Sequence, residues 1–138
     1  MPAHDLYHNS VKNALIKDSW MITDDPLHLQ WGTKDMYVDL GAEQLLAAEQ
    51  GERRIAVEVK SFISPSEMVD LRDSVGQFVM YRAVLRQLQP DRTLYLAVRE
   101  VTFNSLFEEP IGKLLRESEC LNLIVFEPKK EVILRWIP

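Results

Sequence analysis

Residues 55–60 constrain the fold more than any other stretch of the sequence. Three β-branched side chains at positions 55, 57 and 59 alternate with Ala56, Glu58 and Lys60. A period of two is typical of a β-strand with one apolar face. Glu58 and Lys60 therefore point together toward the other face of the predicted strand. The flanking sequence indicates a central position in a sheet, where charged side chains usually need a reason.

The clearest boundary in the sequence follows this strand. Ser64 is predicted to cap a helix, Pro65 suits the first helical position, and Glu67 completes a capping box. We expect the helix to run to about Leu88 and to end at Pro90. Its spacing predicts a buried apolar stripe of Met68, Leu71, Val75, Phe78, Val79 and Leu85.

Apolar runs after this helix predict further strands. Residues 93–98 and 121–126 are almost continuously apolar, as in strands that are covered on both faces. Residues 132–137 follow a Pro-Lys-Lys turn and are expected to close the sheet at an edge. Between the two buried runs, residues 101–107 and 111–119 are predicted to form short helices. Cys120 is expected to be an inert residue of the core.

The first third of the chain predicts a helix and then short strands. Residues 3–18 have a helical apolar stripe, and residues 20–23 are predicted to begin a strand. Asp24-Asp25-Pro26 is a turn signal, and residues 27–31 are expected to form a second strand that ends at Gly32. The apolar stripe of the helix consists of Leu6, Val11, Ala14 and Leu15.

The segment before the strand of residues 55–60 has two possible interpretations. Residues 42–49 contain Ala, Leu, Glu and Gln, which favour helix on propensity alone. The segment is short, however, and residues 50–52 have the composition of a hairpin turn. We favour a strand or an extended arm. The residues just upstream, from Lys34 on, lead into a strand that carries Asp39.

This order of elements predicts one α/β domain over residues 1–138. A strand meander, a long helix and a further strand imply a mixed β-sheet flanked by helices. The chain length of 138 residues fits a single domain that buries its own core.

Composition excludes several classes of protein. No apolar run is long enough to span a bilayer, and the N-terminus lacks a signal-peptide pattern. A single cysteine excludes an internal disulfide and a cysteine-based zinc site, so a reducing cytoplasm is expected. The net charge of −5 opposes non-specific nucleic-acid binding. Any DNA-binding surface is therefore expected to be local or supplied by a partner.

Asp39 and Glu58 are the candidate metal ligands. Mg²⁺ takes oxygen ligands and commonly binds through one or two carboxylates, which these residues would supply from adjacent strands. The backbone carbonyl of Val59 is a possible third ligand. Lys60 could orient or help deprotonate an attacking water and neutralise developing negative charge. Taken alone, the same spacing also fits a polar strand face with a weak cross-strand ion pair.

The long helix carries two further candidates. Gln77 and Tyr81 are four residues apart and therefore lie on one face of the helix. They could point toward the strand ends and contact a metal-bound water or a nucleic-acid backbone. The alternative is a helix flank that is half in solvent.

Three acidic or histidine residues stay open as additional members of the site. If the strand of Asp39 continues to Glu43, Glu43 shares its face and could be a ligand, although a solvated loop position is favoured. Asp5 and His8 are three residues apart on the first helix. A capping or surface role is at least as compatible with their positions.

These residues resemble the PD-(D/E)XK nuclease superfamily. The resemblance rests on Asp39, the run Glu58-Val59-Lys60 and the pair Gln77 and Tyr81, in that order along the elements. Val38 replaces the proline of the family name. The resemblance implies a restriction-endonuclease-like fold with Asp39, Glu58, Lys60, Gln77 and Tyr81 as catalytic residues.

The whole chain more closely resembles the XisH family, the fdxN element excision controlling factors of cyanobacteria. The matching stretches are residues 1–3, 11–15, 24–27, 39–43, 58–62 and 76–78 with Tyr81. By this resemblance the protein would control programmed DNA excision and recombination during heterocyst differentiation. It would act with a site-specific recombinase and a small companion protein, XisI.

Two main hypotheses follow, with DNA as the common partner. The first is a Mg²⁺-dependent endonuclease, with Mn²⁺ as a substitute. The second is a catalytically silent regulatory subunit on a nuclease-like fold that binds XisI or the recombination complex. A homo-oligomer is compatible with both. A third hypothesis, a plain interaction module, would apply if the three charged groups do not converge.

Overall fold

A six-stranded mixed β-sheet organises the computed structural model, which describes residues 7–35 and 45–138. The three central strands run parallel, and antiparallel pairs complete the sheet on both sides. In spatial order the strands are β1 (Met21–Leu27), β4 (Leu45–Gln50), β5 (Arg53–Val59), β6 (Arg92–Arg99), β7 (Leu123–Glu127) and β8 (Val132–Ile137).

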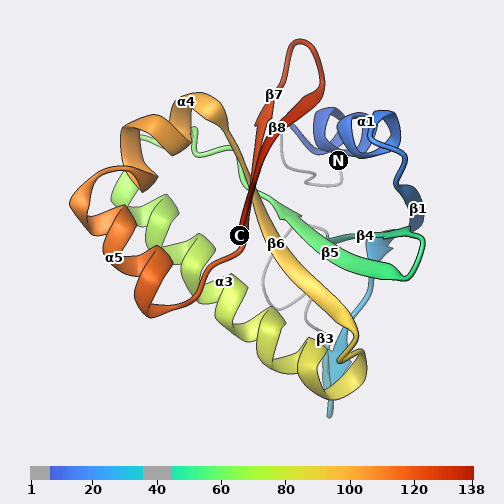
Figure 1. The fold of residues 1–138 in the computed structure, drawn as a ribbon. Coiled ribbons are helices and arrows are strands. Elements are labelled where there is room, and N and C mark those ends of the chain that lie inside the picture. Colours follow the sequence, from blue (N-terminus) through green and yellow to red (C-terminus); the bar gives the residue numbers. More distant parts are fainter. Residues whose placement is uncertain (1–6, 36–44) are drawn as a thin grey trace.

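Helices cover both faces of this sheet (Figure 1). On one face lie α3 (Glu67–Leu88) and the C-terminal helices α4 (Glu100–Thr102), η1 (Phe103–Phe107) and α5 (Pro110–Ser118). On the other face lies α1 (His8–Lys17), which packs against β1 and β8. The predicted α/β architecture, a nuclease-like mixed sheet flanked by helices, is confirmed. None of the described helices is long and apolar enough to cross a membrane.

Strand β5 lies in the middle of the sheet and is covered on both faces. Ile55, Val57 and Val59 pack in the core beneath α1, whereas Ala56 packs in the core beneath α3. The predicted alternation of side-chain direction is therefore confirmed. The second face is not polar surface, because α3 crosses it and excludes solvent.

The segment that the sequence left open between helix and strand contains strand β4. β4 pairs antiparallel with β5 through a turn at Gly51, whose φ of 59° lies in the left-handed region that favours glycine. Leu46, Ala47 and Ala48 are fully buried. Pairing with a central strand thus overrides the helical propensity of this sequence.

Helix α3 begins two residues later than predicted. Its N-cap is Ser66, whose side chain accepts a hydrogen bond from the backbone N–H of Val69. Ser64 instead bonds the backbone of Ser66, so it shapes the turn before the helix. The helix ends at Leu88 as expected. In its predicted stripe, Met68 is 55% exposed and lies in the first turn of the helix.

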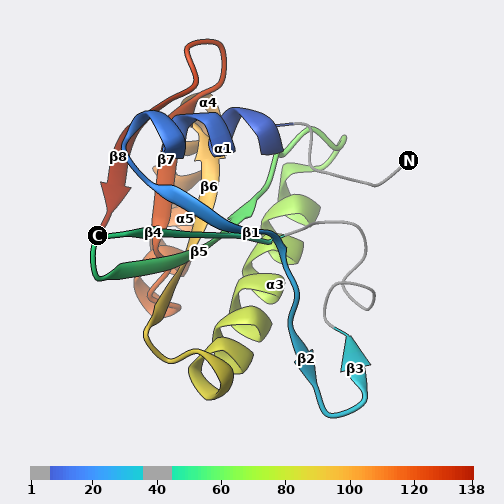
Figure 2. The same ribbon diagram turned by 90° about the vertical axis from the view of Figure 1, so that its right-hand side faces the viewer.

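The predicted turn at Asp24-Asp25-Pro26 is wrong. These residues belong to β1, which pairs with β4 through Leu27 and has register irregularities on either side of Asp24. An irregular edge strand accommodates a proline that a central strand would not. The turn occurs later, at Gly32, between β2 (Gln30–Trp31) and β3 (Lys34–Asp35). This small ribbon extends away from the main sheet (Figure 2).

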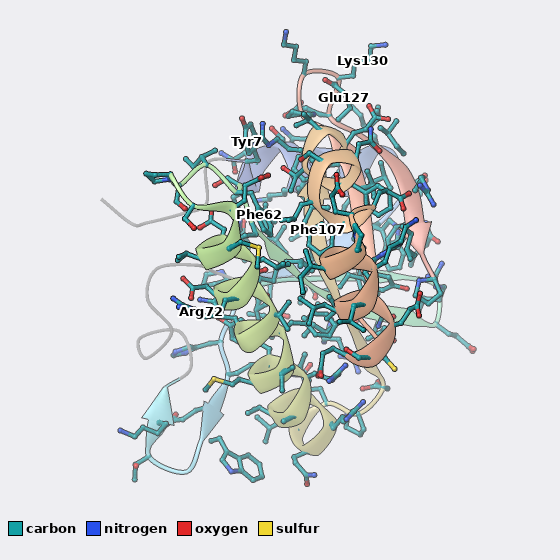
Figure 3. All side chains as sticks on the ribbon, turned by 90° about the vertical axis from the view of Figure 1, so that its left-hand side faces the viewer. Tyr7, Phe62, Arg72, Phe107, Glu127 and Lys130 are labelled. Atoms are coloured by element: carbon teal, nitrogen blue, oxygen red, sulfur yellow. The ribbon has the colours of Figure 1, made fainter. Side chains whose placement is uncertain are left out.

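The C-terminal third follows the predicted order of short helices and strands. β8 is an edge strand, as expected. Phe62, which follows β5, meets Phe107 of η1 edge to face with ring centroids 5.7 Å apart (Figure 3). Cys120 is exposed, not part of the core, because it lies in the turn between α5 and β7 with a φ of 51°.

Candidate functional site

Glu58 is a carboxylate inside the apolar layer between the sheet and α3. Its exposed fraction is 0%, and its partners across the sheet are Leu45 on β4 and Leu96 on β6. Both leucines belong to the core beneath α3. Registered neighbours point to the same face, so the Glu58 side chain enters that layer. Burial of a charged carboxylate is costly without partners, and Glu58 has at least one.

Lys60 follows Glu58 on the same face of the strand. Its backbone N–H donates to the carbonyl of Ala97 at 3.2 Å, so the pairing of β5 with β6 continues to this residue. Backbone groups of successive residues point to opposite sides of a strand. The carbonyl of Val59 therefore points toward the β4 side. It takes no part in the pairing of β5 with β6.

A polar stripe on α3 faces this part of the sheet. Asp70, Ser74, Gln77 and Tyr81 are spaced four, three and four residues apart, which places them on one side of a helix. Asp70, Ser74 and Tyr81 are buried and Gln77 is partly buried. Tyr81 packs in the same core as Leu45, the neighbour of Glu58. Tyr81 therefore reaches the layer that contains the Glu58 carboxylate.

Asp70 and Ser74 are not among the residues predicted from the sequence. The Asp70 carboxylate accepts a hydrogen bond from the backbone N–H of Ser64 at 3.1 Å, and the Ser74 hydroxyl donates to the carbonyl of Leu71. Asp70 thus fixes the connection between β5 and α3. The repeated polar spacing in the helix was the available signal for both.

The second predicted carboxylate lies outside the described residues. Asp39, Glu43 and Asp5 all fall in the segments 1–6 and 36–44. The chain is described again from Leu45, directly opposite Glu58. Within residues 7–35 and 45–138, no three histidine, cysteine or acidic residues gather as a metal-binding group. The ligand pair of Asp39 and Glu58 therefore stays a prediction, as do the catalytic roles of Lys60, Gln77 and Tyr81.

His8 has a buried position, which does not fit the surface role considered as an alternative for it. Only 2% of its side chain is exposed, and its Nε2 lies 2.8 Å from a carboxylate oxygen of Asp25. Lys12 donates to the other oxygen of Asp25, also at 2.8 Å. Burial alone would raise the pKa of Asp25, but the hydrogen bonds from Lys12 and His8 outweigh it and lower the pKa. The cluster ties α1 to β1.

A further cation lies near the carboxyl ends of the central parallel strands. Arg99, the last residue of β6, donates from Nη2 to the carbonyl of Ser61 at 2.9 Å. Its guanidinium carbon stands 4.9 Å from the ring centroid of Tyr7. This fixes a positive charge beside the segment that follows Lys60, where a nucleic-acid phosphate would be attracted.

Comparisons with known proteins agree over almost the entire chain. A family model described as XisH protein matches residues 1–134. A crystal structure of an XisH family protein from Nostoc punctiforme PCC 73102 is 38% identical, with a TM-score of 0.89 and coverage of 97% of this chain and 100% of that chain. A fdxN element excision controlling factor protein from Anabaena variabilis is 39% identical, with a TM-score of 0.88 and coverage of 96% and 98%. The comparison with curated proteins found no match.

Proposed function

Because the chain belongs to the XisH family, we propose that the protein controls excision of a DNA element and does so as a Mg²⁺-dependent endonuclease. The name of the Anabaena variabilis relative supports the first part. The second part depends on the chemistry of the residues around Glu58. In this proposal the protein acts beside a site-specific recombinase and an XisI-type companion.

The observation that carries the proposal is the buried carboxylate of Glu58. A structural role would be served at lower cost by leucine or alanine, since the neighbours across both strands are leucines. The residue is instead a glutamate with 0% exposure in the central strand. Retention of such a group is expected where its oxygens bind a cation or move a proton.

The donors available on β5 fit Mg²⁺. The Glu58 carboxylate and the Val59 carbonyl are hard oxygen donors, the kind that this ion prefers, and Asp39 would add a second carboxylate. When bound, Mg²⁺ would supply a Lewis acid that stabilises negative charge on the phosphate and lowers the pKa of a bound water.

The remaining residues would position the nucleophile and the phosphate. Lys60 would hold the attacking water and neutralise charge on the phosphate oxygens. Tyr81 and Gln77 would donate hydrogen bonds from the helix side of the site. Arg99 would attract the DNA backbone to the carboxyl end of β5 and β6.

A plasmid-nicking assay tests this proposal. Supercoiled plasmid is incubated with the full chain and Mg²⁺ or Mn²⁺, alone and with the XisI-type companion. We expect conversion to nicked circles that stops when EDTA is added. Lys60→Ala is expected to lower the rate at least a hundredfold, consistent with general acid–base contributions of about 10²–10⁴. Lys129→Ala, an exposed lysine in the turn after β7, is the matched control.

A second candidate function is a catalytically silent subunit that binds the companion or the recombination complex. The full burial of Glu58 and Tyr81 favours it, because neither is exposed to a substrate in this arrangement. In that case no nicking would occur under any condition, while the companion would still copurify with both wild type and Lys60→Ala. Nicking by wild type that Lys60→Ala loses would exclude this second function.

A further inference from the structure

A pocket lined by three arginines lies at the far end of the central strands from Glu58. It has a volume of about 190 Å³ and opens between α3 and β6, with Arg82, Arg86 and Arg92 in its wall. Arg92 pairs with the first part of β5, whereas Leu96 of β6 pairs with Glu58. Four residues of strand correspond to roughly 13 Å, so this pocket is separate from the proposed cleavage site.

Arg92 is a buried cation whose hydrogen-bond partners are neutral. Only 6% of it is exposed. Its Nε donates to the side-chain oxygen of Gln89 at 2.7 Å, and its Nη1 donates to the carbonyl of Ile55 at 2.9 Å. Burial and the nearby charge of Arg54 lower the pKa of Arg92. The carboxylates of Asp24, Glu49 and Asp91 oppose this shift without reversing it. Among the described residues none of them forms an ion pair with Arg92, so an anion in the pocket would be its first direct anionic partner.

The other two arginines add to the same positive field. Arg82 and Arg86 lie one turn apart on α3. Arg82 donates to the backbone carbonyl of Glu119, and its guanidinium stands 3.8 Å from the Glu119 carboxylate. Arg86 is exposed and makes no hydrogen bond or ion pair with another described residue. Of the described residues that line the wall, none is an aspartate or glutamate, although the chain as a whole has a net charge of −5.

We propose that this pocket binds a phosphate group. Three arginines line this one pocket, and the forked geometry of a guanidinium group matches the oxygens of phosphate. A water molecule occupies about 30 Å³, so the cavity has room for a phosphate and a few waters. The group can belong to inorganic phosphate, to a nucleotide or to a nucleic-acid backbone, which share this chemistry. The assignment does not depend on cleavage at Glu58.

Titration calorimetry of the full chain tests the proposal. The three ligands are inorganic phosphate, adenosine monophosphate and a short single-stranded oligonucleotide without terminal phosphates, each at constant ionic strength. At least one ligand is expected to bind saturably. Arg86→Gln is expected to weaken that binding about tenfold or more, as for loss of one charge-assisted hydrogen bond. Because Arg86 is exposed, the variant is expected to fold normally.

Arg72→Gln is the matched control. Arg72 is an exposed arginine on the same helix, fourteen residues before Arg86, or about 21 Å at 1.5 Å per residue (Figure 3). Its replacement removes one positive charge and is expected to leave binding unchanged. Binding of the two small ligands would identify a site for terminal phosphate groups, and binding of the oligonucleotide alone would identify a backbone contact. Absence of saturable binding in all three arms, or equal losses in the two variants, would overturn the proposal.

Discussion

Two glycines in helices are expected to respond in opposite directions to substitution by alanine. A Cβ added to Gly112 of α5 would overlap the carbonyl oxygen of Leu106 and would lie 2.5 Å from the Cα of Phe107. Both are backbone atoms of η1, which cannot move aside as a side chain can. A Cβ added to Gly76 of α3 would meet no atom within 4 Å. The first glycine permits close packing of two helices, whereas the second only lowers helix propensity.

The magnitudes follow from these contacts. Gly76→Ala is expected to raise the free energy of unfolding by about 0.8 kcal/mol, the propensity difference between the two residues. Gly112→Ala gains the same propensity but incurs overpacking of about 3 kcal/mol, for a net loss of about 2 kcal/mol. A chain of this size changes its melting temperature by roughly 4 °C per kcal/mol. The melting temperature should therefore rise by about 3 °C in Gly76→Ala and fall by about 8 °C in Gly112→Ala.

Urea denaturation and thermal melting of the two variants and wild type would measure these changes. The free energy of unfolding is expected to rise in Gly76→Ala and to fall in Gly112→Ala. The slope of this free energy against urea concentration is expected to stay the same in both variants. A loss of stability in Gly76→Ala would show that another group occupies the space beside Gly76 into which the new methyl group would point. A neutral effect of Gly112→Ala would refute the packing of α5 against η1 described above.

Two further predictions concern the elements that hold the fold. The pKa of Asp25 is lowered in the folded protein, so its stabilisation is present above its unfolded pKa of about 3.9 and is lost as the pH falls through the folded value. Asp25→Asn should therefore cost about 2 kcal/mol at pH 7, and the difference from wild type should shrink below pH 4; a constant difference across pH would contradict this account. Ser66→Ala should cost about 1 kcal/mol by removing the N-cap of α3, measured by urea denaturation. A change of less than about 0.3 kcal/mol would argue that the cap lies elsewhere, since substitution of a cap by alanine costs at least about 0.5 kcal/mol.

Local sequence patterns were enough to predict most of the strands and helices. The alternation around Val57 fixed the direction of each β5 side chain, and the apolar run before Val98 predicted a strand buried on both faces. These patterns are reliable because period and hydrophobicity act directly on burial. The end of α3 was equally clear because Pro90 cannot continue a helix.

The errors occurred where tertiary contacts outweigh local signals. Asp24-Asp25-Pro26 has the composition of a turn, yet pairing with β4 holds it in β1. Both Ser64 and Ser66 can cap a helix, and the choice of Ser66 depends on Asp70, which binds the N–H of Ser64. Cys120 is exposed because the connection from α5 turns outward before the strand begins.

The candidate site was predictable in part. The alternation and the flanking residues predict the face of the sheet toward which Glu58 points and the central position of its strand. The complete burial of the Glu58 side chain could not be predicted in this way, because it depends on how α3 crosses the sheet. The contact of Arg99 with Ser61 joins residues 38 positions apart, and no periodicity in the sequence indicates it. The pairing of His8 with Asp25 likewise depends on the packing of α1 against β1.

The central claim is that the buried carboxylate of Glu58 serves cleavage of DNA. The most direct test compares Mg²⁺-dependent nicking by wild type and Glu58→Gln, which keeps size and shape but removes the charge. Glu52→Gln, in the exposed turn before β5, is the matched control, and circular dichroism checks that all three proteins are folded. We predict nicking by wild type and Glu52→Gln and its loss in Glu58→Gln. Equal nicking by a folded Glu58→Gln protein would contradict the account.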